Sequence, residues 1–516
     1  MSSAVEEASS AAAVASQTGA GTDKTHADDA QIPVTPLKYR NNATLIAPVR
    51  VDVTASPDMR DRQIARAVRL IRPDLFFTDR PSHTYASVSH AHRITIRQLG
   101  GGLSNHLYVA HPGGREEAVL VRIHAEDEDG VAVADDDGTD ASASPSLPEP
   151  QPASSEAAAT FVDREVENRI LAWLSSEGLA PIFHGRFVKG RIEEFYDGYR
   201  PLSWDELHLA SFAVPVARAL ANLHCAHPPE GVLNSSEEQR REGEIWSHVS
   251  DWFDMASRAS PDVAEADELL QTMKLEWEWL QASLRHPSDG ATASADTRRF
   301  DLRPDSIDMR SAASSYFREI VFTHMDCQSL NILTPCDGFH LDDSSDPDSD
   351  SGSDSTNDKE IDAEQKLEKR GQDDEKGGEY ASVRLIDFEY SGLNPRGADI
   401  ANTFCEHCNM NNLEPNYGEQ YPTDKQQDTF LRAYIAKASP ELAKKLDQQL
   451  GNGEEDGWEP FLATARVQVG RYALLSHIGW SIWAVAQANL STIEFDYLKY
   501  ARLRLEGYFH FKDRFW

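Results

Sequence analysis

The sequence predicts an α+β protein with two lobes, a small β-rich lobe followed by a larger, mostly helical lobe. Short runs with strand patterns lie close together before residue 125, and the connections between them are too short for helical crossovers. From residue 203 onward, apolar residues recur mostly at helical spacing. No internal repeat is visible, so we expect one large two-lobed unit.

The smaller lobe is predicted to hold two helices and two groups of strands. In chain order these are a helix, an antiparallel meander, a second helix and a hairpin, over residues 59–71; 93–99, 106–110 and 118–123; 161–176; and 182–188 with 191–196. The hairpin is divided by Lys189 and Gly190, which have the character of turn residues.

The larger lobe is predicted to be helical except for short apolar runs at 320–323 and 383–387. Its expected helices cover residues 203–224, 238–258, 262–284, 396–410, 424–449, 458–490 and 494–510. The resulting domain boundaries are a disordered tail over 1–54, the small lobe over 55–200 and the large lobe over 201–516.

The net charge of −35 excludes one class of function. Phosphates would be repelled, so binding of nucleic acid, or of an anionic membrane, through a global basic field is not expected. Two tracts, 125–160 and 337–380, hold −21 of this charge and are rich in Ser, Asp, Pro and Gly. Such composition cannot bury enough apolar surface, so we expect two disordered acidic insertions.

Targeting and membrane signals are weak. Residues 1–30 lack the apolar segment of a secretory signal, which favours the cytoplasm. Five cysteines, an odd number, fit a reducing compartment better than a disulfide scaffold. The run 472–493 has no charged residue but contains His477, Gln487 and Asn489, so it predicts a buried helix and not an integral membrane segment.

The chemistry centres on the pattern His324-x-Asp326-x-x-x-x-Asn331, which apolar runs flank on both sides. In phosphoryl transfer an Asp accepts a hydroxyl proton and an Asn five residues later reaches a metal ion. A second apolar run ends in Asp387, with Glu389 close behind. Two hard carboxylates suit Mg²⁺ that carries substrate phosphates. The alternative for each Asp, helix capping or a surface ion pair, explains less of the combined pattern.

The smaller lobe supplies matching parts for a nucleotide. Glycines at 100–102 precede Ser104 and Asn105, where backbone N–H groups and polar side chains can approach phosphates. On the third strand, Arg122 ends an apolar run and stands where a kinase places its phosphate-binding basic residue. Glu165 and Glu167 in the next helix are candidates to orient Arg122. Each of these charged residues alone could be a solvated surface charge. Their occurrence together and in this order favours the functional interpretation.

At this point the chain resembles the choline/ethanolamine kinase family, which has a protein-kinase-like two-lobed fold. The resemblance covers roughly residues 55–515 outside the acidic insertions. The motifs that carry it are GGLSN at 101–105, VLVRIH at 119–124, GLAPIFHGRFVKGRIEEF at 178–195, HMDCQSLN at 324–331, LIDFEY at 385–390, RGADIAN at 396–402, FCE at 404–406, WSIW at 480–483, IEFDY at 493–497 and Tyr500.

The resemblance implies roles for the reacting centre. Asp326 would be the catalytic base toward the substrate hydroxyl, and Asn331 and Asp387 would hold Mg²⁺ together with Glu389. These residues stand at the positions where the family has its catalytic and metal-binding side chains.

The resemblance also implies an ATP site. Arg122 would contact the phosphates and Glu167 would orient it, while Gln328 would lie beside the nucleotide. Glu194 and Phe195 would form the hinge that meets adenine. Ser104 and Asn105 complete the candidate ATP-binding residues.

The expected alcohol pocket follows from the chemistry of a quaternary ammonium, which cannot donate hydrogen bonds. Aromatic faces hold such a cation with roughly 0.5–2 kcal/mol per ring. Trp480 and Trp483 share one helix face, Tyr390 and Tyr500 could close the box, and Glu406 could supply the counter-charge. Alone, a Trp pair at this spacing is typical of core packing; the family resemblance favours a cation cage.

The sequence departs from the family at two places. Met325 stands where the family usually has Asn, and the run ending at Asn411 lacks a Tyr common in choline kinases. The second departure bears on the choice between choline and ethanolamine. The run Asp326-Cys327-Gln328 is more similar to the choline kinase form and favours choline.

The predicted function is ATP-dependent phosphorylation of choline to phosphocholine, which the family carries out as the first step toward phosphatidylcholine. The resemblance implies a cytosolic enzyme with small-molecule partners, often a homodimer. One alternative is an ethanolamine kinase or a dual kinase. Two others are a non-catalytic acidic interaction protein on a kinase scaffold and a kinase for another small molecule, such as an antibiotic.

Overall fold

The structure is a computed structural model that describes residues 40–76, 94–100, 105–113, 117–124, 161–259, 264–285, 309–336, 382–410, 413–448, 457–491 and 495–516. The expected acidic insertions, Ser104, Asn411 and most of the expected tail lie outside these described residues.

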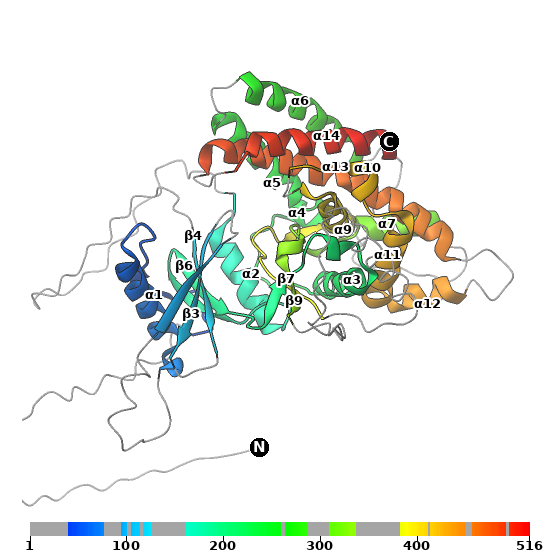
Figure 1. The fold of residues 1–516 in the computed structure, drawn as a ribbon. Helices are drawn as coiled ribbons and strands as arrows, with labels where there is room; N and C mark the ends of the chain where they lie inside the picture. The colour runs from blue at the N-terminus through cyan, green and yellow to red at the C-terminus, as the bar shows by residue number, and fades with distance from the viewer. Residues whose placement is uncertain are drawn as a thin grey trace, which may run out of the picture.

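The smaller lobe is built on a six-stranded sheet with the order β1-β5-β6-β4-β3-β2 (Figure 1). β1 pairs parallel with β5, and the other neighbours pair antiparallel. The strands are β1 (Ile46–Arg50), β2 (Ile94–Leu99), β3 (Asn105–Pro112), β4 (Val119–His124), β5 (Phe183–Val188) and β6 (Gly190–Glu194). The predicted meander and hairpin are confirmed, with ends that differ by one or two residues.

Strand β1 corrects the expected boundary of the tail. Residues 46–50 fall within the predicted tail over 1–54, yet Ala47 and Val49 are buried against the sheet. Sequence reasoning missed this strand because a five-residue segment at a lobe's edge carries little periodic signal.

Helix α1 (Pro57–Ile71) covers one face of this sheet and begins with a proline in its first turn. Its buried stripe includes Ile64, Val68 and Ile71, which belong to one apolar cluster with the strands. The β5–β6 turn needs glycine at Gly190, because a Cβ there would lie 2.6 Å from the backbone oxygen of Arg122. Glycine at this position therefore lets the start of β6 approach the backbone of Arg122 closely.

Helix α2 (Arg164–Ser176) lies between the sheet and the helical lobe (Figure 1). Asp163 caps it by accepting hydrogen bonds from the backbone N–H groups of Glu165 and Val166. Ile170 and Leu174 pack into the core of the larger lobe. Its first turn places the buried Glu167 toward the space between the lobes.

The larger lobe is mostly helical, as predicted. Its helices are η2 (Asp205–His208), α3 (Ala210–His224), α4 (Glu237–Glu242), α5 (Ile245–Ala259), α6 (Ala264–Leu280), η3 (Gln281–Arg285), α7 (Met309–Arg318), α9 (Arg396–Cys405), η5 (Glu406–Cys408), α10 (Tyr417–Gln420), α11 (Asp424–Ala438), α12 (Pro440–Gln448), α13 (Trp458–Leu490) and α14 (Tyr497–Phe515). The short η1 (Pro73–Leu75) follows α1 in the smaller lobe.

Three of the expected helices are interrupted, each for a local reason. The segment 203–224 divides into η2 and α3 at Leu209, whose ψ of 134° is extended. The segment 238–258 divides into α4 and α5 at Gly243, whose φ of 107° is incompatible with a helix. The segment 424–449 divides into α11 and α12 before Pro440, which lacks the N–H needed to continue the helix.

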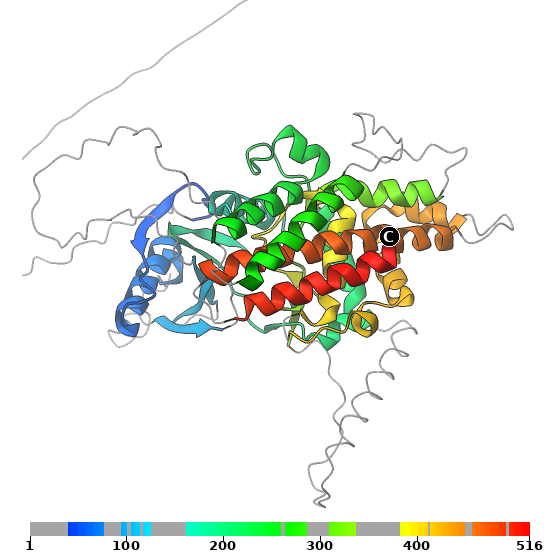
Figure 2. The same cartoon turned by 90° about the horizontal axis from the view of Figure 1, so that it is seen from above.

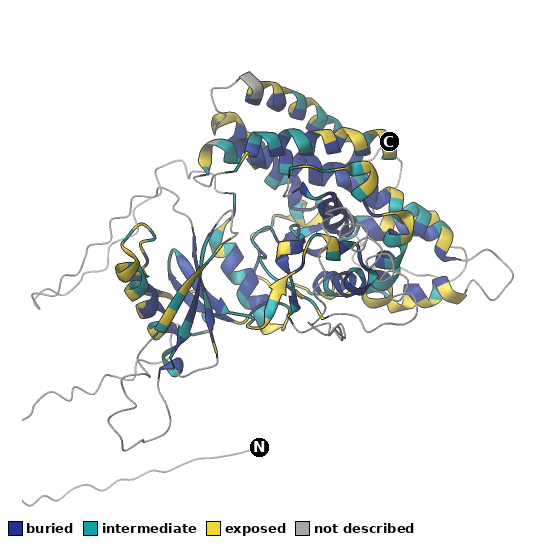
Figure 3. Cartoon of the chain, viewed as in Figure 1, coloured by how far each residue is buried: buried dark blue, intermediate teal, exposed yellow. Residues whose placement is uncertain are grey.

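Helix α13 is the centre of the larger lobe and packs against α5, α7, α9 and α14. Figure 2 shows α13 and α14 lying side by side, and Figure 3 shows α13 buried along much of its length. Its uncharged run is explained by this burial, since Leu474, Ile478 and Ile482 are fully buried. Among the described helices, none combines the length and apolar character that a bilayer crossing requires.

Two small sheets carry the predicted motifs. One has the order β10-β9-β7 and the other pairs β11 with β8. Their elements, with the intervening η4, are β7 (Tyr199–Pro201), β8 (Ile320–Thr323), η4 (Ser329–Asn331), β9 (Ile332–Pro335), β10 (Arg384–Leu385) and β11 (Gly392–Pro395). The loop with Asp326 runs from β8 to η4, and the loop with Asp387 runs from β10 to β11, so short ladders fix both loops side by side.

Candidate active site

One cavity between the two lobes gathers most of the predicted site residues. It encloses about 840 Å³, including its open mouth. The predicted residues that line it are Asn105, Arg122, Asp326, Gln328, Asn331, Asp387, Glu389, Tyr390, Glu406, Trp480, Trp483 and Tyr500. These side chains come from strands of the smaller lobe and from loops and helices of the larger one, so the cavity exists only when both lobes are in place.

The buried carboxylate of Asp399 fixes the backbone of the loop that carries Asp326. Asp399 accepts hydrogen bonds from the backbone N–H groups of His324 and Met325, over 2.7 and 2.8 Å. Met325 has a φ of 64°, in the left-handed region that side chains other than Gly, Asn and Asp rarely adopt. The two hydrogen bonds to Asp399 hold the backbone in this conformation and so aim Asp326 into the cavity.

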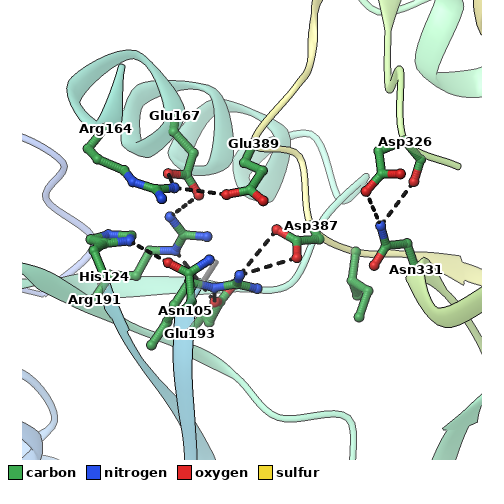
Figure 4. A network of polar contacts seen from close by, with 12 residues as sticks. Asn105, His124, Arg164, Glu167, Arg191, Glu193, Asp326, Asn331, Asp387 and Glu389 are labelled. Carbon is green, nitrogen blue, oxygen red and sulfur yellow. Dashed lines mark hydrogen bonds and ion pairs between the residues drawn. The ribbon is translucent and has the colours of Figure 1, made fainter. Parts of the chain in front are cut away.

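Asp326 is oriented by its neighbour in the predicted pattern. The amide nitrogen of Asn331 donates to the carboxylate of Asp326 over 2.8 Å and to its backbone carbonyl over 2.9 Å (Figure 4). Burial, followed by the nearby carboxylates of Glu406 and Asp387, raises the pKa of Asp326 well above its usual value. A carboxylate with a raised pKa is a stronger proton acceptor once it is ionised.

Arg122 forms ion pairs with carboxylates from both lobes. Its Nε donates to Glu193 over 2.9 Å, and its Nη1 donates to Asp387 over 3.1 Å (Figure 4). Arg191 shares the same carboxylate of Glu193, with an N–O separation of 3.4 Å. The guanidinium of Arg122 is therefore fixed in the cavity wall beside Asp387.

Glu167, which the sequence predicts to orient Arg122, contacts other partners. It accepts hydrogen bonds from Arg191 over 2.6 Å and from Arg164 over 2.8 Å. Within the smaller lobe Glu193 accepts a hydrogen bond from Arg122, and Glu167 accepts one from the neighbouring Arg191, so the orienting of Arg122 by Glu167 stays a prediction. The register of the sheet explains this, because Arg122 stands opposite Arg191 and Glu193 follows two positions later on the same face.

Three carboxylates lie close enough together to share a cation. Oxygens of Glu167, Asp387 and Glu389 lie within 4.8 Å of one another, and Arg164 donates to Glu389 over 2.9 Å. Burial, followed by the charge of Asp387, raises the pKa of Glu389. For Glu167 burial also opposes ionisation, but Arg191 and Arg164 lower its pKa. Hard oxygen donors at this spacing fit a divalent ion such as Mg²⁺.

The other end of the cavity is aromatic. The ring centroids of Tyr390 and Trp480 are 5.1 Å apart, and those of Trp480 and Trp483 are 5.4 Å apart. The structure thus brings together the tryptophans and tyrosine that the sequence predicts for a cation cage. Edge-to-face packing at these distances leaves ring faces available to a ligand.

Glu406 and Tyr500 meet at a buried arginine that sequence reasoning missed. Arg504 donates through Nη2 to Glu406 over 2.6 Å and through Nε to the hydroxyl of Tyr500 over 2.8 Å. It follows Tyr500 by four residues on α14, so it shares one helix face with a predicted site residue. That spacing is the signal that could have identified it. Phe495, Leu107 and Leu330 also line the cavity without having been predicted.

Three of the predicted ATP-binding residues that the structure describes lie outside the lining of this cavity: Glu167, whose contacts are given above, and Glu194 and Phe195. Glu194 ends β6 and accepts a hydrogen bond from the backbone N–H of Ile182 over 3.0 Å. Phe195 follows it and packs edge-on against His111. Both stand at the point where the chain leaves the six-stranded sheet for the larger lobe. Their role as the adenine hinge stays a prediction.

Comparisons with known proteins agree with this architecture. The choline/ethanolamine kinase family model matches residues 155–509. The human choline/ethanolamine kinase is 28% identical over 354 residues, which cover 68% of each chain. The rat choline/ethanolamine kinase is also 28% identical, over 82% of this chain and 81% of its own.

Solved structures confirm the fold. A choline kinase from Cryptosporidium parvum Iowa II superposes with a TM-score of 0.52 at 21% identity and covers 88% of this chain and 96% of its own. A Plasmodium vivax ethanolamine kinase reaches 0.55 at 16% identity over 90% and 94%. The predicted protein-kinase-like two-lobed fold is confirmed. The family match extends over more than half of the residues, and the chain belongs to the choline/ethanolamine kinase family.

Proposed function

We propose that this protein transfers the γ-phosphoryl group of ATP to the hydroxyl of choline and forms phosphocholine. The observation that carries the proposal is the set of groups gathered in one cavity. Asp326 lines it together with Arg122 and the carboxylates Asp387 and Glu389, and with the aromatic rings of Tyr390, Trp480, Trp483 and Tyr500. An alcohol whose cationic end occupies the aromatic side would present its hydroxyl to Asp326.

In the proposed mechanism the residues of this chain position the alcohol and take up its proton. Asp326 accepts the hydroxyl proton as the oxygen attacks the γ-phosphorus, the bond from that phosphorus to the β,γ-bridging oxygen breaks and ADP leaves; Asn331 keeps the carboxylate oriented. Arg122 donates to phosphate oxygens. Asp387, Glu389 and Asn331 would hold Mg²⁺, which supplies neutralisation of phosphate charge when bound.

The remaining nucleotide contacts are part of the same proposal. Asn105 and Gln328 line the cavity and would contact the nucleotide, with Ser104 adjacent in the chain. Glu194 and Phe195 would meet adenine at the end of β6. The smaller lobe, from β1 to residue 200, would act as the nucleotide lobe, and residues 201–516 would act as the catalytic lobe.

The aromatic end of the cavity supports choline as the alcohol. A trimethylammonium group has no hydrogen-bond donor, and ring faces attract it without requiring acceptors. Glu406 adds negative charge, although Arg504 offsets part of it. Ethanolamine is the second candidate substrate, because proteins named ethanolamine kinase are also among the similar sequences; one from mouse is 25% identical.

The direct test is a competitive assay with ATP, Mg²⁺, choline and ethanolamine, read by ³¹P NMR. We expect phosphocholine to form with the higher kcat/KM. An Asp326→Asn variant and a reaction with excess chelator serve as controls, and both should abolish turnover. If neither alcohol is phosphorylated, the proposed function is wrong. A higher kcat/KM for ethanolamine would reassign the substrate.

We further propose, from family membership, a cytosolic enzyme that assembles as a homodimer and feeds the synthesis of phosphatidylcholine. Light scattering of the purified chain would measure its mass. A single-chain mass at micromolar concentration would contradict the dimer.

A further inference from the structure

The side chain of Trp480 lines two cavities. A smaller cavity of about 360 Å³, called the rear cavity below, adjoins the cavity described above. Its lining includes Trp252, Met325 and Ser476. The two cavities share Tyr390 and Trp480 in their linings. The indole also packs against the rings of Trp252, Tyr390 and Trp483, with centroid distances of 6.0, 5.1 and 5.4 Å. A directed polar interaction adds to these ring contacts in setting its orientation.

That interaction is a hydrogen bond to Asn402. The indole Nε1 of Trp480 donates to Oδ1 of Asn402 over 2.9 Å. Oδ1 also accepts from the hydroxyl of Ser476 over 2.7 Å. Ser476 and Trp480 are four residues apart on α13, so one helix face presents both donors to one oxygen. The two lone pairs of that oxygen are then both used, which fixes which way the amide points.

The surroundings of Asn402 show that its amide is placed for this contact and not for general packing. The residue is fully buried on α9, three residues after Asp399, which holds the Asp326 loop. Its Nδ2 has no hydrogen-bond partner among the described residues, and Asn402 lines the rear cavity. A buried amide that leaves its own donor unsatisfied is costly. Within the described part of the chain, the hydrogen bonds that Asn402 makes through its side chain are the two accepted by its oxygen, from Trp480 and Ser476.

We propose that Asn402 is a positioning residue that determines substrate specificity: by fixing the indole of Trp480 it sets the preference for choline over ethanolamine. This inference rests on the proposed function. A trimethylammonium group depends on ring faces held at contact distance, since it has no other strong attraction to the wall. A primary ammonium can instead donate hydrogen bonds to Glu406, so its binding depends less on where the indole stands.

The test compares substitutions at Asn402 in the full chain. Asn402→Leu and Asn402→Ser both remove the acceptor from Trp480, one with similar volume and one with a short polar group. We expect the KM for choline to rise about tenfold. The kcat for choline and the KM for ethanolamine should stay within about threefold, because Asp326 and Glu406 are untouched.

Two further variants separate this role from a structural one. Asn402→Asp keeps an oxygen acceptor and should hold the choline KM near the wild-type value. Ser476→Ala removes the other donor to the same oxygen but leaves the bond to Trp480, and it should also leave the choline KM unchanged. The melting temperature of each variant reports whether it is folded.

The outcomes divide clearly. A choline-specific rise in KM in the Leu and Ser variants, with rescue by Asp, supports the proposal. An unchanged choline KM, or an equal rise for both alcohols, overturns it. Unfolding of both the Leu and the Ser variants also overturns it, since Asn402 would then act on stability. A wild-type protein that phosphorylates neither alcohol instead overturns the proposed function itself.

Discussion

The charged half and the aromatic half of the cavity hold their side chains by different forces. In the charged half, three arginines and four carboxylates neutralise one another; they are Arg122, Arg164, Arg191, Glu167, Glu193, Asp387 and Glu389. In the aromatic half, rings stand in edge contact, and one ion pair, Glu406 with Arg504, lies beside them.

Because ion pairs hold one half and ring contacts hold the other, the two halves should respond differently to a ligand. In the charged half Arg122 already has Asp387 as a partner, so an incoming phosphate must compete with that carboxylate. In the aromatic half, Trp480 lines two cavities and is held by ring contacts and by one directed hydrogen bond to Asn402. The charged half should therefore control turnover, and the aromatic half should control which alcohol binds.

The largest effect is expected where the halves meet. Asp326→Asn keeps the shape of the side chain but removes the proton acceptor, so kcat should fall by about 10²–10⁴. Single-turnover phosphorylation measures this, and calorimetry should find choline binding largely retained. A variant with wild-type kcat would remove Asp326 from the proposed mechanism.

A second large effect is expected in the charged half. Arg122→Met removes a buried donor near the phosphates, so kcat should fall by about 10²–10³ while the KM for choline changes little. Arg97→Met, on an exposed position of β2, is the matched control and should behave as wild type. Equal loss of choline affinity would show that the two halves are not separable.

The counterpart in the aromatic half is Arg504→Met. It breaks a buried ion pair with Glu406, which should lower the free energy of unfolding by about 3–5 kcal/mol. In the folded fraction, the choline KM should rise by about tenfold with the ATP KM unchanged. Denaturant titration and steady-state kinetics measure the two effects. Substitution of the partly buried Arg502 nearby serves as the control. A raised KM for ATP in Arg504→Met would contradict the division of roles between the charged half and the aromatic half of the cavity.

The smallest effect is expected for the departure at Met325. Its φ of 64° suits Asn, and its side chain lines the rear cavity, not the reacting centre. Met325→Asn should leave kcat/KM for choline within about threefold of wild type. A larger loss would show that the rear cavity influences the aromatic wall.

Much of the fold was predictable because long periodic segments report their own burial. The meander, the hairpin and α13 all appear where the pattern places them. The short strands β1, β7 and β9 were not predicted, because three to five residues cannot establish a period. Their pairing depends on partners far away in sequence.

The chemical groups of the site could be predicted from the sequence, because the carboxylates, the amide, the arginine and the tryptophans occur in motifs whose order and spacing are local properties. The tertiary structure alone decided which partners these residues take. Glu193 contacts Arg122, because the β4–β6 register places it on that face. Arg504 meets Glu406, and Asn402 meets Trp480, because separate helices pack together. Long-range pairing depends on packing geometry, which no local pattern encodes.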